Sequence, residues 1–164
     1  MTHLQASLIK GTSELKRLNQ GHWLNQTIMP PDTRTDIIIG TDAEGLLLHD
    51  DSLLPLWKDF AEALCPLATH EHGILRLTMR NVQLPIAVLK PALKTAPLQR
   101  LLLMNNGLGC AGIEFVEHLL EADTTIEVLS LNKNKIEFAN NSLSLAEAAS
   151  KHTRLQLSDL EYMD

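Results

Sequence analysis

The sequence predicts an α/β fold, a short solenoid of strand–helix units with a parallel inner β-sheet and outer helices, preceded by an N-terminal α/β cap. Three observations predict it. Leucine accounts for 32 of the 164 residues. Two stretches, 98–108 and 126–136, share one pattern of apolar residues and an asparagine. The segments between such stretches place apolar residues at helical spacing, as outer helices require.

Residues 1–45 form an N-terminal segment whose structure the sequence leaves open. Leucines recur at roughly helical spacing within 2–19, but Gly11 interrupts the pattern. Two short apolar runs, 36–40 and 45–49, are separated by the turn-forming sequence TDAEG. They indicate a strand, a turn and a second strand.

Residues 46–73 are expected to form an N-terminal cap that covers the open edge of the first repeat. Within them, 51–64 has the pattern of an amphipathic helix whose N-terminus is capped by Asp51 or Ser52. Its apolar face comprises Leu53, Leu56, Trp57, Phe60 and Leu64. We expect Trp57 to pack inside the cap rather than to bind a ligand.

The two clear repeats both follow the pattern LxxLxLxxNxL, and every position of the first has its counterpart at one constant offset in the second. The asparagine is Asn106 in one and Asn134 in the other, and Gly112, Val116 and Leu120 follow Asn106 after six, ten and fourteen residues. The chain thus resembles the leucine-rich repeat family, in its ribonuclease-inhibitor-like class. The resemblance implies a right-handed leucine-rich-repeat solenoid that binds a protein or peptide on its concave sheet face.

Two weaker copies flank the clear pair and bring the repeat region to 74–164, with four repeats of which the last is incomplete. One copy spans 74–84, and the other lies around 155–160, where Leu155 is expected to correspond to Leu129. Val82 and Leu160 occupy the asparagine position in these copies. Their register is open by two residues, so that Leu75 and Leu77 are the alternative to Leu77 and Met79 in the first.

Each repeat has a physical explanation. Alternate residues of a strand point to one face, so Leu101 and Leu103 are buried while Leu102 points the other way. The amide of Asn106 can bond to backbone groups that the following turn leaves unpaired.

Helices are predicted between the strands. Apolar spacing indicates helices over 86–93, which Pro91 should bend or shorten, and over 113–120. A third helix is expected to begin near Asn141 or Ser142.

Catalytic signatures are absent, and we expect neither an enzyme nor a cofactor or metal site. The GxGxxG pattern at 107–112 suggests a dinucleotide site, but the following strand does not end in the acidic residue that such a site requires. The repeat accounts for the same glycines. The alternative is an enzyme or metal site within residues 1–73, built from His49, Asp50, Asp51, His70 and His72.

The net charge of −6 argues against binding to nucleic acid or to an anionic membrane. No uncharged apolar stretch of transmembrane length and no secretory signal pattern is present in the sequence. We therefore expect a cytoplasmic or nuclear protein.

The candidate site is the concave face of the sheet, where the outward positions of the repeats carry several arginines around an apolar centre. These residues are Arg76, Thr78, Arg80, Arg100, Leu102, Met104, Val128, Ser130, Asn132, Arg154 and Gln156. Arginine beside apolar side chains is typical of protein interfaces, so the expected partner has an acidic surface. The alternative is a solvated face whose arginines pair with Glu127, Asp159 or Glu161.

A second interpretation concerns assembly. The chain is then a fragment or a self-associating subunit of a longer repeat protein, since the C-terminal strand leaves an uncovered edge that can pair with another copy.

Overall fold

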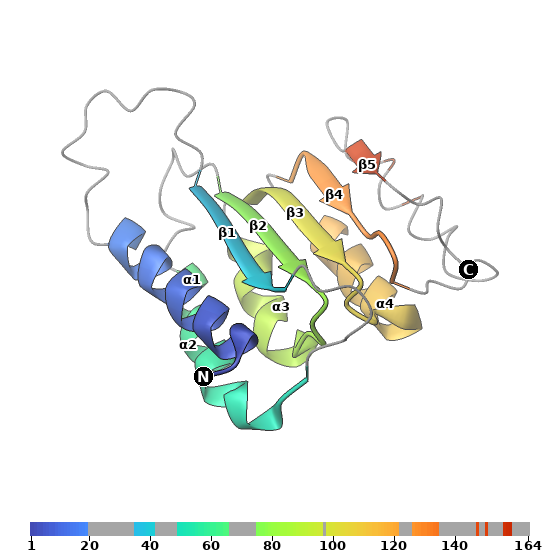
Figure 1. Cartoon of the computed structure of the whole chain (residues 1–164). Coiled ribbons are helices and arrows are strands. Elements are labelled where there is room, and N and C mark those ends of the chain that lie inside the picture. Colours follow the sequence, from blue (N-terminus) through green and yellow to red (C-terminus); the bar gives the residue numbers. More distant parts are fainter. Residues whose placement is uncertain are drawn as a thin grey trace, which may run out of the picture.

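The strands lie side by side in chain order, β1-β2-β3-β4-β5, and form one parallel sheet in the computed structural model (Figure 1). The structure describes residues 1–19, 35–41, 49–65, 75–96, 98–121, 126–134 and 156–158, with residues 147 and 150. The strands are β1 (Thr35–Gly40), β2 (Leu75–Arg80), β3 (Leu98–Met104), β4 (Val128–Ser130) and β5 (Gln156–Ser158). The helices are α1 (His3–Asn19), α2 (Leu54–Leu64), α3 (Ile86–Thr95) and α4 (Gly109–Glu121), with a 3-10 turn, η1 (Asp51–Leu53). The predicted α/β class with a parallel sheet is confirmed.

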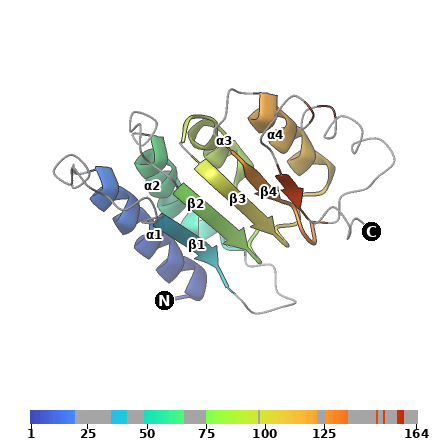
Figure 2. The same cartoon turned by 90° about the horizontal axis from the view of Figure 1, so that it is seen from above.

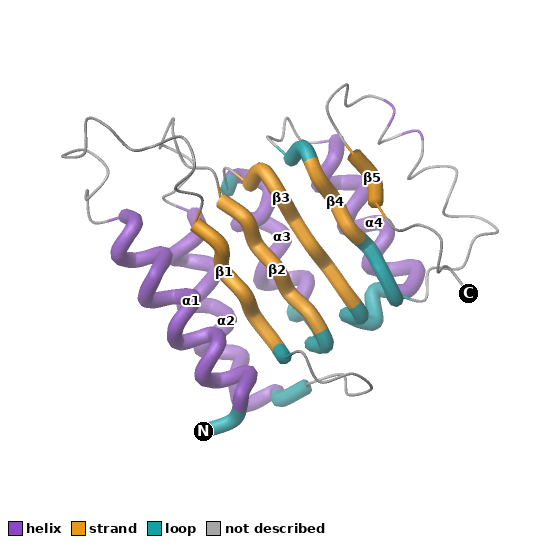
Figure 3. Tube along the Cα trace, turned by 45° about the horizontal axis from the view of Figure 1, so that its top comes forward, coloured by secondary structure: helices purple, strands orange, loops and turns teal. Residues whose placement is uncertain are grey.

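Helices α2, α3 and α4 lie on one side of the sheet, as the view from above shows (Figure 2). The strands turn alternate apolar residues toward them: Ile37, Ile39, Leu77, Met79, Leu101, Leu103 and Leu129 are all buried. From the helices, residues such as Phe60, Leu89, Leu93, Val116 and Leu120 complete this core. The other side of the sheet carries the alternate residues and bears no helix among the described residues (Figure 3).

The N-terminal segment, left open by the sequence, contributes a helix and a strand. Strand β1 pairs in parallel with β2, and α1 lies alongside β1. Helix α1 continues through Gly11 without interruption. The position favours glycine because a Cβ there would come within 2.9 Å of Ile39 Cδ1 and 3.1 Å of Ile37 Cγ2. A glycine lets the helix approach the strand closely. The second predicted strand, 45–49, falls almost wholly outside the described residues.

The segment expected to act as a cap forms η1 and α2, which packs against α1 and α3. It is β1, rather than this segment, that pairs with the edge of β2. The predicted capping residue was also wrong: Asp50, one residue before the expected position, accepts hydrogen bonds from the Ser52 backbone N–H (2.9 Å) and hydroxyl (2.6 Å). Trp57 is buried, with its ring edge-to-face against Phe60 at 6.2 Å, as predicted.

Strand pairing determines the register of the outer copies. Leu77 and Met79 pair with Leu101 and Leu103, which selects the first of the two registers left open. Leu75 rather than Ile74 pairs with Leu98, because the ladder shifts by one residue between Leu75 and Arg76. This irregularity leaves one extra residue in β3, as in a β-bulge.

Pairing between β3 and β4 follows the offset expected from the two clear repeats, with Arg100 beside Val128. The same offset continues into β5, where Gln156 pairs with Val128 and Leu157 with Leu129. The predicted register of the last copy, which placed Arg154 beside Val128, was therefore wrong by two residues. The error arises because the number of residues between β4 and β5 decides this register, and the alternation of residues within a strand carries no information about that number.

Two predicted helices are present with different bounds. Helix α3 continues through Pro91 to Thr95, and α4 begins at Gly109, four residues before the expected start at 113. The helix expected from Asn141 or Ser142 lies outside the described residues, apart from single helical positions at 147 and 150. Within the described part of the chain, no helix has the length and apolar character needed to cross a membrane.

Candidate functional site

The side of the sheet that bears no helix among the described residues is termed the open face. Its residues fall into rows that cross the strands, because residues paired in register on parallel strands lie side by side. The first row contains Asp36, Arg76, Arg100, Val128 and, by backbone pairing, Gln156. The second contains Ile38, Thr78, Leu102 and Ser130, and the third contains Arg80 and Met104.

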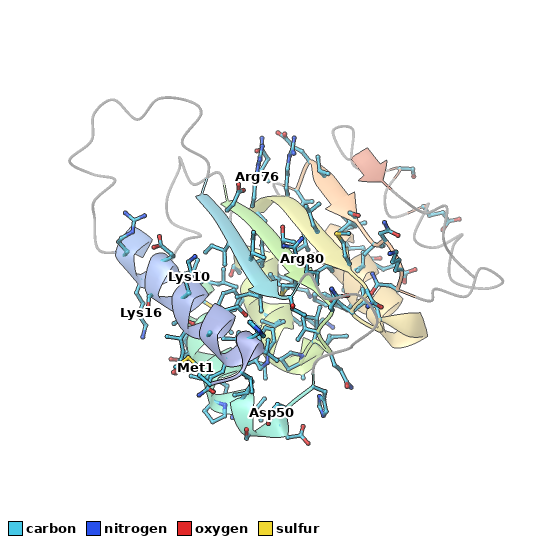
Figure 4. The ribbon with its side chains drawn as sticks, viewed as in Figure 1. Met1, Lys10, Lys16, Asp50, Arg76 and Arg80 are labelled. Carbon is cyan, nitrogen blue, oxygen red and sulfur yellow. The ribbon has the colours of Figure 1, made fainter. Side chains whose placement is uncertain are left out.

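Arg76 and Arg100 are direct partners on β2 and β3, so they form adjacent positive charges in the first row. The Nε atom of Arg76 lies 3.7 Å from Oδ1 of Asp36, which is an ion pair but is too long for a hydrogen bond. The Arg76 side chain is 25% exposed and that of Asp36 is 53% exposed. Figure 4 shows Arg76 and Arg80 on the strands of this face.

Arg100 forms no ion pair with any acidic side chain of the described residues. One of the acidic residues expected to neutralise it, Glu127, instead accepts a hydrogen bond from the Gln99 side chain at 2.9 Å. The other two, Asp159 and Glu161, lie outside the described residues. Among the described residues of the open face, three are therefore basic, Arg76, Arg80 and Arg100, and one is acidic, Asp36.

Apolar side chains accompany these arginines. Ile38 is 49% exposed, and Leu102, Met104 and Val128 are half-buried. Ile38 lies beside Thr78 of β2, with Leu102 beyond it on β3, so the face offers apolar surface on both sides of β2 that a partner can remove from water.

For four of the predicted site residues, the structure either shows a buried or enclosed polar group or describes no side chain. Ser130, which pairs with Leu102, is buried. Arg154 lies outside the described residues, and nothing is described of the Gln156 side chain. Asn132 is half-buried, and its Oδ1 atom is enclosed without a hydrogen-bond partner.

The structure places the other predicted site residues together on one face, as the alternation predicted. These are Arg76, Thr78, Arg80, Arg100, Leu102, Met104 and Val128. Asp36 and Ile38 were missed, because the run 36–40 was assigned to the N-terminal segment rather than to the sheet. Their signal was present, since the sequence DIIIG places two residues at alternate positions on the face opposite Ile37 and Ile39.

The ends of β2, β3 and β4 are bordered by turns of one geometry. Asn81, Asn105 and Lys133 each have a positive φ, of 54°, 50° and 57°. Asparagine is one of the few residues with a side chain that readily adopts this conformation. The Asn105 amide donates to Oδ1 of Asn81 at 2.7 Å, and the Asn81 amide donates to the Thr41 carbonyl oxygen at 2.6 Å.

The asparagines that follow, Asn106 and Asn134, are 1% exposed and bond to the neighbouring strand. The Asn106 amide donates to the Met79 carbonyl oxygen at 2.9 Å. The Asn134 amide donates to the carbonyl oxygens of Leu103 and Leu131, and its Oδ1 accepts from the Asn106 backbone N–H at 2.7 Å. These bonds hold the ends of successive strands together and support the open face.

The glycine pattern at 107–112 has a structural explanation. Gly107 and Gly109 have φ values of 61° and 51°, which most residues avoid. A Cβ on Gly112 would overlap the Cβ of Leu108, which packs against it. The turn and the close packing of α4 thus account for all three glycines.

The alternative site in residues 1–73 is only partly within the described residues. His49 Nε2 lies 3.2 Å from Oδ1 of Asp51, and both side chains are exposed. The Ser52 hydroxyl and backbone N–H lower the pKa of Asp50 below its ordinary value. His70 and His72 lie outside the described residues, and within those residues no three His, Cys, Asp or Glu side chains are grouped to hold a metal.

Comparison of this chain with protein-family models, curated proteins and solved structures gives no match.

Proposed function

We propose that this chain is a leucine-rich-repeat solenoid of the ribonuclease-inhibitor-like class that acts as a non-enzymatic interaction module. Its open face binds an extended segment of a protein or peptide partner that carries acidic and apolar side chains. The observation that carries this proposal is the sheet face itself, which presents three arginines beside apolar residues and bears no helix among the described residues.

The repeat assignment is supported by periodicity and by side-chain bonding. One constant offset along the chain relates the residues that pair from β3 to β4 and again from β4 to β5. Asn106 and Asn134 each bond to a carbonyl oxygen of the preceding strand, Met79 in one case and Leu103 in the other. A unit that completes the hydrogen bonds of its predecessor is what a stacked array requires.

Charge supports an acidic partner. The whole chain carries a net charge of −6, yet the described residues of the open face include Arg76, Arg80 and Arg100 against Asp36 alone. A local charge opposite to that of the protein directs one class of partner to one surface. The neighbouring apolar side chains provide the area whose burial stabilises the complex.

The proposal places the protein in the cytoplasm or nucleus and assigns it neither a cofactor nor a metal. Self-association through the last strand stays a prediction from the sequence.

Photo-crosslinking tests where a partner binds. We would replace Ile38 on the open face, and in a separate chain Glu62 on the exposed side of α2, by the photoreactive residue benzoylphenylalanine. Both sites are exposed, and each variant is checked for the wild-type circular dichroism spectrum. In a lysate of the protein's own cells, we expect a crosslinked partner from position 38 and none from position 62.

The identity of the crosslinked peptide completes the test. A partner segment that contains Asp or Glu supports the proposal. Products from position 62 alone, equal products from both positions, or no product from position 38 contradict it.

A further inference from the structure

We infer that Arg76 and Arg100 jointly bind one carboxylate of the partner, and that the partner carries an apolar side chain two residues from that acidic residue. This inference rests on the proposed function, because it specifies what the open face recognises.

The first step is the geometry of the two arginines. Arg76 and Arg100 are register partners on neighbouring parallel strands, which lie about 4.8 Å apart. Side chains that start from neighbouring positions on the two strands can bring their guanidinium groups to the two oxygens of a single carboxylate. A lysine pair would lack the planar fork that fits this geometry.

The second step is that their donors remain available. Within the described residues, Arg100 forms no ion pair, and Arg76 has one contact, at 3.7 Å from Asp36. The Nε atom of Arg76 is enclosed, so a partner would contact the exposed remainder of this side chain, which is 25% exposed as a whole. An acceptor brought by a partner would thus add charge-assisted hydrogen bonds without breaking existing ones.

The third step is spacing. Arg100, Leu102 and Met104 occupy alternate positions of β3, and their paired residues on β2 are Arg76, Thr78 and Arg80. Alternate residues of any extended chain repeat every ~6.6 Å. A peptide laid along β3 with its carboxylate at Arg76 and Arg100 therefore places its next same-side residue over Leu102.

Asp36 adds a test of opposite sign. Its carboxylate is next to Arg76 in the first row and repels any incoming carboxylate. At a distance of ~6 Å in water, the repulsion between two unit charges corresponds to roughly a threefold change in affinity. Asp36→Asn should therefore strengthen the binding of an acidic peptide, whereas loss of the arginines should weaken it.

Four synthetic peptides with blocked termini test the spacing. Two place Glu and Leu two residues apart, Gly-Glu-Ser-Leu-Gly and its reverse Gly-Leu-Ser-Glu-Gly, because either chain direction fits the face. One places them side by side, Gly-Glu-Leu-Ser-Gly, and one is neutral, Gly-Gln-Ser-Leu-Gly. Binding is followed by NMR through the side-chain Nε–H signals of Arg76 and Arg100 and the methyl signals of Leu102.

We expect at least one of the spaced peptides to shift the signals of both arginines and of Leu102 together. The neutral peptide should bind about tenfold more weakly, because it cannot accept the charge-assisted hydrogen bonds. Equal binding of the spaced and side-by-side peptides overturns the inference. So does inorganic phosphate if it shifts the arginine signals more than either spaced peptide does, since the pair would then be a general anion site.

The variants provide matched controls. Arg76→Gln with Arg100→Gln removes two positive charges from the open face, and Lys10→Gln with Lys16→Gln removes two from the exposed side of α1. We expect about a tenfold loss of affinity for the bound spaced peptide in the first variant and less than a twofold change in the second. Asp36→Asn should increase affinity roughly threefold. Equal losses in the two double variants contradict the inference.

Failure here is distinguishable from failure of the proposed function. If benzoylphenylalanine at position 38 crosslinks its partner to the same extent in the Arg76→Gln, Arg100→Gln chain, the open face binds a partner without the carboxylate contact, and this inference fails alone. If position 38 gives no crosslink even in the chain that retains both arginines, the proposed function fails with it.

Discussion

The two ends of the described sheet complete their backbone hydrogen bonds in different ways. At the N-terminal end, the Gly40 backbone N–H of β1 donates to the Ser7 hydroxyl of α1 at 3.1 Å. From β2 to β4, the strand ends are joined by the buried amides of Asn106 and Asn134. The β1 end thus uses a flanking helix in addition to an asparagine from the end of the next strand, since the Asn81 amide also donates to the Thr41 carbonyl oxygen, whereas the ends from β2 to β4 are joined by asparagine side chains.

The difference shows how stability is distributed. Each asparagine bonds to the strand before it, so the units around β3 and β4 stabilise their neighbours. Among the described residues no strand precedes β1, and α1 covers its buried residues Ile37 and Ile39. We therefore expect perturbations between β3 and β4 to cost more than equivalent ones between α1 and β1.

The largest effect is expected from Asn134→Leu. The substitution leaves unpaired the carbonyl oxygens of Leu103 and Leu131 and the N–H of Asn106, all of which Asn134 satisfies. We expect a loss of about 3 kcal/mol in the free energy of unfolding, measured by urea denaturation. Asn132→Leu is the control, because the enclosed Oδ1 of Asn132 has no hydrogen-bond partner, and it should cost less than about 1 kcal/mol. Equal losses would contradict the role of Asn134 in joining the strands.

The next effect compares one helical glycine from each region. Replacement by alanine favours any helix by up to about 1 kcal/mol, so the difference between Gly112→Ala and Gly11→Ala reports the space around each Cβ. At Gly112 the new Cβ overlaps the Leu108 Cβ, which cannot turn away, whereas at Gly11 it meets the end of the Ile39 side chain, which can. We expect Gly112→Ala to be less stable than Gly11→Ala by about 2 kcal/mol in the same denaturation experiment. The reverse order would show that α1 is the more tightly packed of the two helices.

A smaller effect is expected where α1 meets β1. Ser7→Ala removes the acceptor of the Gly40 N–H and should cost about 1 kcal/mol. Ser13→Ala, on the exposed side of α1, should be neutral or slightly stabilising because alanine is the better helix former. Hydrogen exchange at the Gly40 amide should accelerate in the first variant only, and unchanged exchange would show that the Ser7 hydroxyl does not protect this amide.

The smallest effect concerns pH at the start of η1. The Ser52 hydroxyl and backbone N–H lower the pKa of Asp50 in the folded chain, so this group stabilises the fold above its unfolded pKa. That contribution is lost as the pH falls through the folded pKa. In an NMR titration, Ser52→Ala should move the Asp50 pKa upward, toward the ordinary value for aspartate. An unchanged pKa would show that the hydroxyl does not bond to Asp50.

The sequence predicted strands β3 and β4 and the faces of their residues. The alternation around Leu101 and Leu103, and its repetition around Leu129, correctly identified which side chains are buried and which are on the open face. Most of the candidate site followed from this alternation. Arg154 did not, because a shift of two residues leaves the alternation unchanged and only pairing with β4 distinguishes the two registers.

Local pattern was sufficient to predict the α/β class and the arginines of the central open face, because strand and helix periodicities are encoded within a few neighbouring residues. The other features required tertiary contacts. Pairing with β2 made 36–40 the first strand of the sheet, and close contact with Ile37 and Ile39 explained a glycine within α1. Both depend on contacts between segments far apart in the chain, whose free energy no short stretch of sequence contains.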